Sequence, residues 1–157
     1  MGYETENDGK TDSPLKAFEE MDLRAYRCLL AEDNDLNAEI AEDILGESGL
    51  VIDRAKDGAE AVELLLQAPA DHYDIILMDI QMPRMNGYDA TRAIRATDRP
   101  DCKRIPIIAM TANAFAEDVQ AAHTAGMNEH IAKPLDLKVL ARIMTNYLLQ
   151  KNGSNEI

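Results

Sequence analysis

The residues best suited to chemistry in this sequence are three acids, one hydroxyl and one amine, each at or just after the end of a short apolar run. They are Glu32, Asp33, Asp79, Thr111 and Lys133. Three carboxylates brought close together repel one another, and a bound cation relieves that repulsion. Because the set offers oxygen ligands and no thiolate or imidazole, it favours Mg²⁺, with Mn²⁺ as a substitute. A carboxylate nucleophile beside a divalent cation, a lysine and a hydroxyl is the set that phosphoryl transfer requires.

The predicted reaction places the phosphoryl group on Asp79, as an aspartyl phosphate. Lys133 would bind one phosphoryl oxygen as a point charge. Thr111 would donate a hydrogen bond to another oxygen of the same group. This chemistry needs mainly positioning and neutralisation of charge, which these side chains supply.

A simpler interpretation is that acids after strands only cap the next helix. Asn34 or Asp35 fits that role, because both precede a stretch with helical periodicity. Asp79 does not fit it, since it follows the apolar run Ile75-Ile76-Leu77-Met78 and precedes Ile80. Asp79 therefore requires another explanation, which the phosphoacceptor role gives.

The elements that must position these residues follow from the pattern of apolar runs and polar turns. The pattern predicts five strands, at residues 26–31, 50–55, 73–79, 105–110 and 129–132. A helix follows each strand, and the last one covers residues 136–150. Strands that alternate with helices favour a three-layer α/β domain. Right-handed crossovers favour a doubly wound (βα)5, flavodoxin-like fold with a five-stranded parallel sheet in the order 2-1-3-4-5.

Length and composition limit the classes that remain. The 157 residues suit one domain, and we expect an acidic flexible tail or linker at 1–24, a domain at 25–151 and a frayed end at 152–157. Within the tail, the sequence leaves open a short helix at 15–21. A net charge of −13 disfavours binding to nucleic acid. No apolar run approaches the ~18 residues of a membrane span, so we expect no membrane contact by this chain. We expect this chain to be located in the cytoplasm, and the same location is expected if its parent protein is anchored in a membrane.

Four separated motifs stand in a fixed order along the chain. They are Glu32-Asp33, Met78-Asp79-Ile80-Gln81-Met82-Pro83, Met110-Thr111-Ala112 and Lys133-Pro134. Their residues and spacing resemble the receiver domains of response regulators in bacterial two-component signalling. The resemblance covers residues 25–150, in every predicted element and in order.

The resemblance implies a role at the metal site for each matching position. Asp79 matches the phosphoacceptor, which also binds Mg²⁺. Asp33 matches the acid that binds the ion directly, and Glu32 matches the one that acts through water. The main-chain carbonyl of Gln81 matches the third protein ligand.

The resemblance also implies roles around the phosphoryl group. Thr111 matches the switch hydroxyl, and the Lys133-Pro134 peptide bond is expected to be cis. Gln81 and Asn113 match the variable positions that tune dephosphorylation. The sequence departs from the family at His130, where the family often has Tyr or Phe as a rotating switch.

The motifs that include Asn34, Asn37 and residues 110–115 are similar to receivers fused to hybrid sensor histidine kinases. This resemblance implies a phosphohistidine donor on a kinase dimerisation domain, and a histidine phosphotransfer domain as the acceptor that follows Asp79. The expected dock lies at the start of the helix after the first strand and in the loop after the fifth strand. A standalone single-domain response regulator is the alternative. The sequence leaves dimerisation open, and it leaves open whether the parent chain is an enzyme.

Three other classes share part of the pattern. A haloacid-dehalogenase-like phosphatase has an acid two residues after its nucleophile, where this chain has Gln81. A flavin-binding flavodoxin-like module has a Ser-, Thr- and Gly-rich first loop, where this chain has Glu32-Asp33-Asn34-Asp35. A degenerate receiver that acts only as a binding surface tends to lack the acceptor, an acid or the lysine, all of which are present here.

Overall fold

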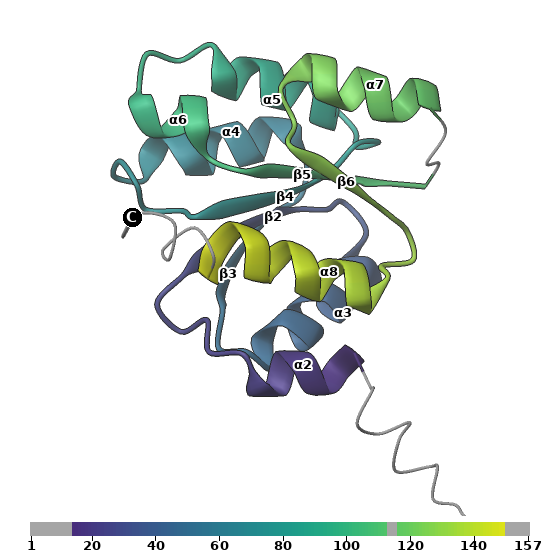
Figure 1. Cartoon of the computed structure of the whole chain (residues 1–157). Helices are drawn as coiled ribbons and strands as arrows, with labels where there is room; N and C mark the ends of the chain where they lie inside the picture. The colour runs from purple at the N-terminus through teal and green to yellow at the C-terminus, as the bar shows by residue number, and fades with distance from the viewer. Residues whose placement is uncertain (1–13, 113–115, 150–157) are drawn as a thin grey trace, which may run out of the picture.

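A five-stranded parallel sheet forms the centre of the structure, with the order β3-β2-β4-β5-β6 (Figure 1). The structure is a computed structural model that describes residues 14–112 and 116–149. The strands are β2 (Arg27–Ala31), β3 (Val51–Ala55), β4 (Ile75–Asp79), β5 (Ile107–Thr111) and β6 (Glu129–Ala132). Counted from the first strand, the order is 2-1-3-4-5, so the predicted fold class is confirmed.

Helices cover both faces of this sheet (Figure 1). On one face lie α4 (Gly58–Gln67), α5 (Gly87–Arg95), α6 (Pro100–Arg104) and α7 (Ala116–Ala125). On the other lie α2 (Pro14–Glu20), α3 (Asp35–Gly46) and α8 (Leu137–Met144), and α8 continues as a π-helical turn, η1 (Thr145–Leu149). The short helix α6 was not predicted. Among the described residues, no helix combines the length and apolar character that crossing a bilayer requires.

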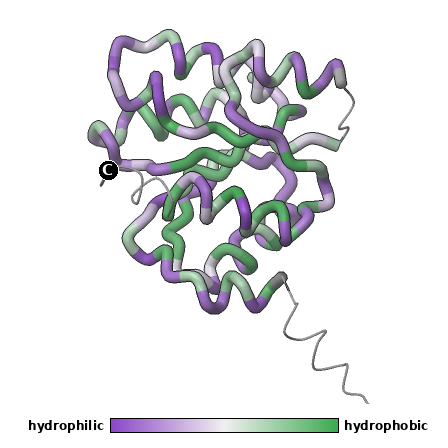
Figure 2. Tube along the Cα trace, viewed as in Figure 1, coloured by the Kyte–Doolittle hydropathy of each residue, from purple (hydrophilic) through white to green (hydrophobic). Residues whose placement is uncertain are grey.

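The three inner strands, β2, β4 and β5, carry apolar runs without alternation because both of their faces are buried. Leu30 and Leu77 point to the cluster under α3 and α8, whereas Leu29 and Ile76 point to the cluster under α4, α5 and α7. All four are 0% exposed. Burial of each such side chain stabilises the fold by about 1.5–3 kcal/mol. Figure 2 shows the resulting concentration of hydrophobic residues in the central strands.

The helices that begin at the carboxyl edge of the sheet are held there by local caps. The side chains that accept a hydrogen bond from the first turn are those of Asn34, Asp57, Asn86 and Asp136. After the Asn86 cap, a Cβ at Gly87 would collide with the main-chain carbonyl of Asp79. Glycine at this position therefore lets α5 begin directly against the end of β4.

The N-terminal segment differs from the flexible tail expected at residues 1–24. Phe18 of α2 and Leu23 are both 0% exposed and belong to the cluster under α3 and α8. The main-chain N–H of Leu23 also donates to the carbonyl of Ser48 at 2.8 Å. Phe18 and Leu23 therefore pack against the domain, although both lie within the stretch expected to be a flexible tail. Residues 1–13 and the end predicted to be frayed, 152–157, lie outside the described residues.

Candidate functional site

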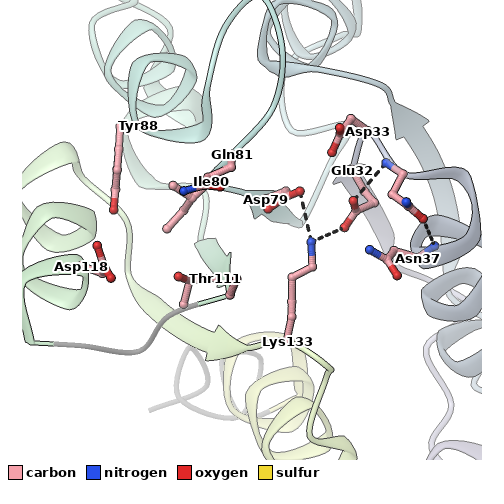
Figure 3. A pocket seen from close by; sticks show the side chains of 12 residues that line it. Glu32, Asp33, Asn37, Asp79, Ile80, Gln81, Tyr88, Thr111, Asp118 and Lys133 are labelled. Carbon is pink, nitrogen blue, oxygen red and sulfur yellow. Dashed lines mark hydrogen bonds and ion pairs between the residues drawn. The ribbon is translucent and has the colours of Figure 1, made fainter.

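A cavity of about 310 Å³ opens at the carboxyl edge of the sheet, where β2, β4 and β5 end (Figure 3). All five residues predicted to carry the chemistry line it: Glu32, Asp33, Asp79, Thr111 and Lys133. They come from four segments that are far apart in sequence, and parallel pairing brings their ends to one edge. The structure thus gathers the predicted set around one space.

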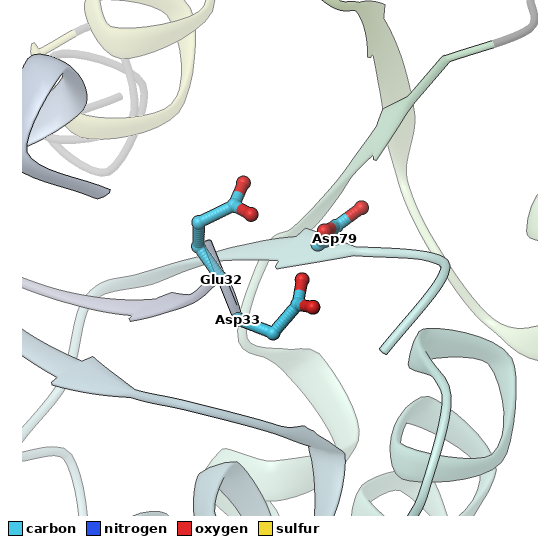
Figure 4. A group of neighbouring side chains, drawn as sticks. All are labelled: Glu32, Asp33 and Asp79. Carbon is cyan, nitrogen blue, oxygen red and sulfur yellow. The ribbon is translucent and has the colours of Figure 1, made fainter. Parts of the chain in front are cut away.

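Glu32, Asp33 and Asp79 form the acidic part of this cavity (Figure 4). One carboxylate oxygen from each residue lies within 4.8 Å of those of the other two. Glu32 and Asp79 are 2% and 5% exposed, whereas Asp33 is exposed to solvent. Hard oxygen donors at this spacing, one of them open to water, suit an ion such as Mg²⁺ that keeps part of its hydration shell. The residues therefore fit the predicted metal.

The Lys133 ammonium joins two of these acids. Its Nζ donates to Glu32 Oε1 at 3.0 Å and to Asp79 Oδ2 at 3.2 Å (Figure 3). Burial lowers the pKa of Lys133, but the hydrogen bonds and charges of Glu32 and Asp79 outweigh burial and raise it. Lys133 is therefore a fixed positive charge in the cavity. The Lys133-Pro134 peptide bond is cis.

The carboxyl of Asp79 is held in an environment that disfavours its charge. Burial is the largest cause and the charge of Glu32 is the next, and together they raise the pKa of Asp79 to about 6. The charge and hydrogen bond of Lys133 act in the opposite direction. A cation at the site would favour the ionised, nucleophilic form, because it offsets the repulsion from Glu32.

The remaining predicted residues differ in whether they line the cavity. Thr111 is 7% exposed and lines the cavity, and the exposed Gln81 lines it as well. His130 is half-buried on β6 opposite Ala109 and is not part of the lining. Asn113 lies outside the described residues.

Two cavity residues were missed by reasoning from the sequence: Tyr88 of α5 and Asp118 of α7 (Figure 3). Both stand in the first turn of a helix that follows a strand contributing to the site. Burial raises the pKa of the Tyr88 phenol, and the charge of Asp118 raises it further. Since ligands bind beyond the strand ends, polar residues in these first turns are a signal that could have identified them.

Comparisons with known proteins agree on one family. The sequence profile of the response regulator receiver domain matches residues 28–145. Probable histidine kinase 2 of rice (Oryza sativa subsp. indica) is 36% identical over 155 residues, which cover 92% of this chain and 15% of that protein. The chain thus spans a small part of the relative that it matches.

Two solved structures are similar to most of this chain. The receiver domain of sensor histidine kinase PA1611 from Pseudomonas aeruginosa, with a magnesium ion in its active-site cleft, is 39% identical with a TM-score of 0.70. The match covers 78% of this chain and 96% of that one. The receiver domain of Ssk1 from Saccharomyces cerevisiae, solved with the histidine phosphotransfer protein Ypd1, is 28% identical with a TM-score of 0.72, over 80% of this chain and 90% of that one. These proteins come from a plant, a bacterium and a yeast, so a bacterial source is not confirmed.

Proposed function

The chain belongs to the family of response regulator receiver domains, and we propose from that premise that Asp79 accepts a phosphoryl group from a phosphohistidine. One observation carries the proposal: a nearly buried aspartate shares a cavity with two further acids, a hydroxyl and a lysine whose Nζ is 3.2 Å from it. Each of these groups is one that phosphoryl transfer uses. We propose the cytoplasm as the location, and the unpaired thiols of Cys28 and Cys102 agree with a reducing compartment.

In the proposed step, an Asp79 carboxylate oxygen attacks the phosphorus atom. The P–N bond to the histidine breaks and its electron pair goes to the imidazole nitrogen, so a ring that carries a proton on its other nitrogen leaves as neutral imidazole. Lys133 is placed to balance the negative charge that the phosphoryl oxygens bring beside Asp79, and it can bind one of these oxygens without leaving Glu32, which lies 3.0 Å away. Thr111 lines the side of the cavity where its hydroxyl can donate to a second phosphoryl oxygen.

Mg²⁺, when bound, would supply positive charge that neutralises the carboxylates and the phosphoryl oxygens. We assign its direct ligands to Asp33, Asp79 and the main-chain carbonyl of Gln81, and we assign a contact through water to Glu32. Mn²⁺ would satisfy the same oxygen ligands. Support comes from the 4.8 Å limit on the spacing of the three carboxylates.

After phosphorylation, Thr111 would act as the switch hydroxyl, while Gln81 and Asn113 would set how fast water attacks the aspartyl phosphate. His130 stands where the family often has an aromatic switch. Its half-buried place on β6, away from the cavity, favours an indirect role through packing.

We propose that the chain is the receiver of a hybrid sensor histidine kinase. Its similarity to the rice kinase over 92% of its own length supports this assignment. The donor would be the dimerisation domain of that kinase, and a histidine phosphotransfer domain would be a second partner. A standalone response regulator is the alternative.

The proposed dock for these helical partners is the exposed apolar face of α3. Leu36 and Ile40 are 64% and 46% exposed, although both are large apolar side chains. Beside them lies a hollow of about 440 Å³ between α3 and the loop after β6, lined by Ile40, Ile44, Pro134 and Leu135 among others. Lys133 and Glu32 line both this hollow and the site, so a helix seated here would bring its histidine close to Asp79.

A phosphohistidine donor and Mg²⁺ provide the test. The wild-type chain should acquire one acid-stable, base-labile phosphoryl group, and Asp79→Asn should acquire none because an amide is a poor nucleophile. Asp89→Asn, an exposed aspartate on α5 outside the cavity, is the control and should label normally. Labelling of Asp79→Asn at the wild-type level would refute the assignment. Repeated hydrolysis of a simple phosphomonoester would instead favour the phosphatase class.

A further inference from the structure

The cavity has a second polar wall, opposite the lysine, that the proposed reaction does not use. Tyr88 from α5 and Asp118 from α7 form it, and in Figure 3 their oxygen atoms lie on the far side of Thr111 from Lys133. Both side chains are partly buried. A carboxylate at this place is unexpected, because the cavity already holds three acids and must admit a phosphoryl anion.

The negative charge of Asp118 acts on its neighbour in this wall, Tyr88. It is one of the causes that raise the pKa of the Tyr88 phenol, next after burial, and it outweighs the opposing charge of Arg92. Glu117, the preceding residue, is also in the first turn of α7, but it is exposed and does not line the cavity. A general preference for acids at a helix N-terminus accounts for both residues, and only the position of Asp118 places its charge at the site.

We propose that Asp118, backed by Tyr88, is a specificity-determining residue that disfavours small dianionic phosphodonors at Asp79. The inference rests on the proposed function and deepens it. A dianionic donor such as acetyl phosphate meets the field of Asp118 and releases an acetate anion beside it. A phosphohistidine with a protonated ring carries a smaller net negative charge and releases a neutral imidazole, so Asp118 repels it less. The wall would thus restrict labelling by free metabolic acyl phosphates and preserve the response to a kinase.

Two small phosphodonors that label the same residue but differ in net charge can test this proposal. With acetyl phosphate, a dianion, the Asp79 oxygen forms a bond to phosphorus, the P–O bond breaks and acetate leaves with the electron pair. With phosphoramidate, the same bond forms, the P–N bond breaks and the nitrogen leaves as ammonia with its protons. The protonated nitrogen of phosphoramidate offsets one phosphoryl charge, so this donor is repelled less by Asp118.

The experiment measures the Mg²⁺-dependent labelling rate with each donor for wild type, Asp118→Asn, Asp118→Ser and the matched control Glu117→Gln. The ratio of the acetyl phosphate rate to the phosphoramidate rate should rise about two- to fivefold in both Asp118 variants, the effect of one charge across a partly solvated cavity. It should stay at the wild-type value in Glu117→Gln. The difference between Asp118→Asn and wild type should shrink between about 0.05 M and about 0.5 M salt, which a merely structural effect would not do.

A second readout does not depend on labelling. The pKa of Tyr88, followed by NMR of ¹³C-labelled tyrosine, should fall in Asp118→Asn and stay unchanged in Glu117→Gln. Equal donor ratios in all four proteins would overturn the inference and leave the proposed function standing. If neither donor labels wild type, and beryllofluoride with Mg²⁺ shifts no resonance near Asp79, the proposed function itself is overturned.

Discussion

Asp79→Asn should make the metal-free domain more stable at neutral pH, although it abolishes the proposed reaction. Burial and the charge of Glu32 raise the pKa of Asp79 from 3.8 to about 6. Each pKa unit corresponds to about 1.36 kcal/mol, so the ionised carboxylate costs the folded state up to about 3 kcal/mol. An amide is a weaker acceptor for Lys133, which offsets part of the gain. We expect a net gain of about 1–2 kcal/mol in the free energy of unfolding.

The pH dependence of this gain follows from the direction of the shift. Between about pH 4 and pH 6 the folded state keeps a proton on Asp79 that the unfolded state has lost. The folded state therefore binds more protons in this window, and the stability of wild type falls as the pH rises through it. Asparagine does not titrate, so the gain from Asp79→Asn should be complete above about pH 6 and absent near pH 4.

Urea denaturation in EDTA at about pH 4.5 and about pH 7.5 measures this effect. Asp101→Asn is the matched control, because Asp101 is also 5% exposed but pairs with Arg99 at 2.8 Å, whose hydrogen bond lowers the pKa of Asp101. That variant should lose stability at the higher pH. Added Mg²⁺ should stabilise wild type more than Asp79→Asn, since a ligand of the folded state alone raises the free energy of unfolding. A loss of stability in Asp79→Asn at pH 7.5, equal to that in Asp101→Asn, would refute the electrostatic account of the site.

Three further changes test the packing of α2, the ion pair at the site and the proposed docking surface on α3. Phe18→Ala should lower the free energy of unfolding by about 3–5 kcal/mol in urea denaturation, because it leaves a cavity in the core; a loss below about 1 kcal/mol would mean that α2 is not packed as described. Lys133→Met should raise the pKa of Asp79 by about one to two units in an NMR titration without metal, since it removes a positive charge 3.2 Å away; an unchanged pKa would contradict the ion pair. Leu36→Asp with Ile40→Asp should slow phosphotransfer from a phosphotransfer domain about tenfold or more, while labelling by phosphoramidate stays at the wild-type rate; equal loss with both donors would place the defect at the site rather than at the dock.

Most of the fold could be predicted from the sequence, because the strongest sequence signals are local. The unbroken apolar run Ile75–Met78 indicates a strand covered on both faces, and the structure buries all of it. The Asn34 cap marks the start of α3, and the glycine at 87 marks the start of α5. Each follows the end of a strand, and both strands end at the same edge of the sheet. Once parallel pairing is inferred, the residues at those ends must meet, so the five predicted residues could be placed in one site before any coordinates.

Only the tertiary structure decided the features that depend on contacts between distant segments. Phe18 lies in an acidic segment with little periodicity, and its burial follows from the contact of α2 with α8, more than a hundred residues away. His130 lies outside the cavity lining and Tyr88 lies within it, although either aromatic ring could have been assigned to the site from its type alone. The pKa of Asp79 depends on the distances to Glu32 and Lys133 and on the loss of water around it. Such energies vary with separation and burial, which the three-dimensional arrangement sets and a one-dimensional pattern does not contain.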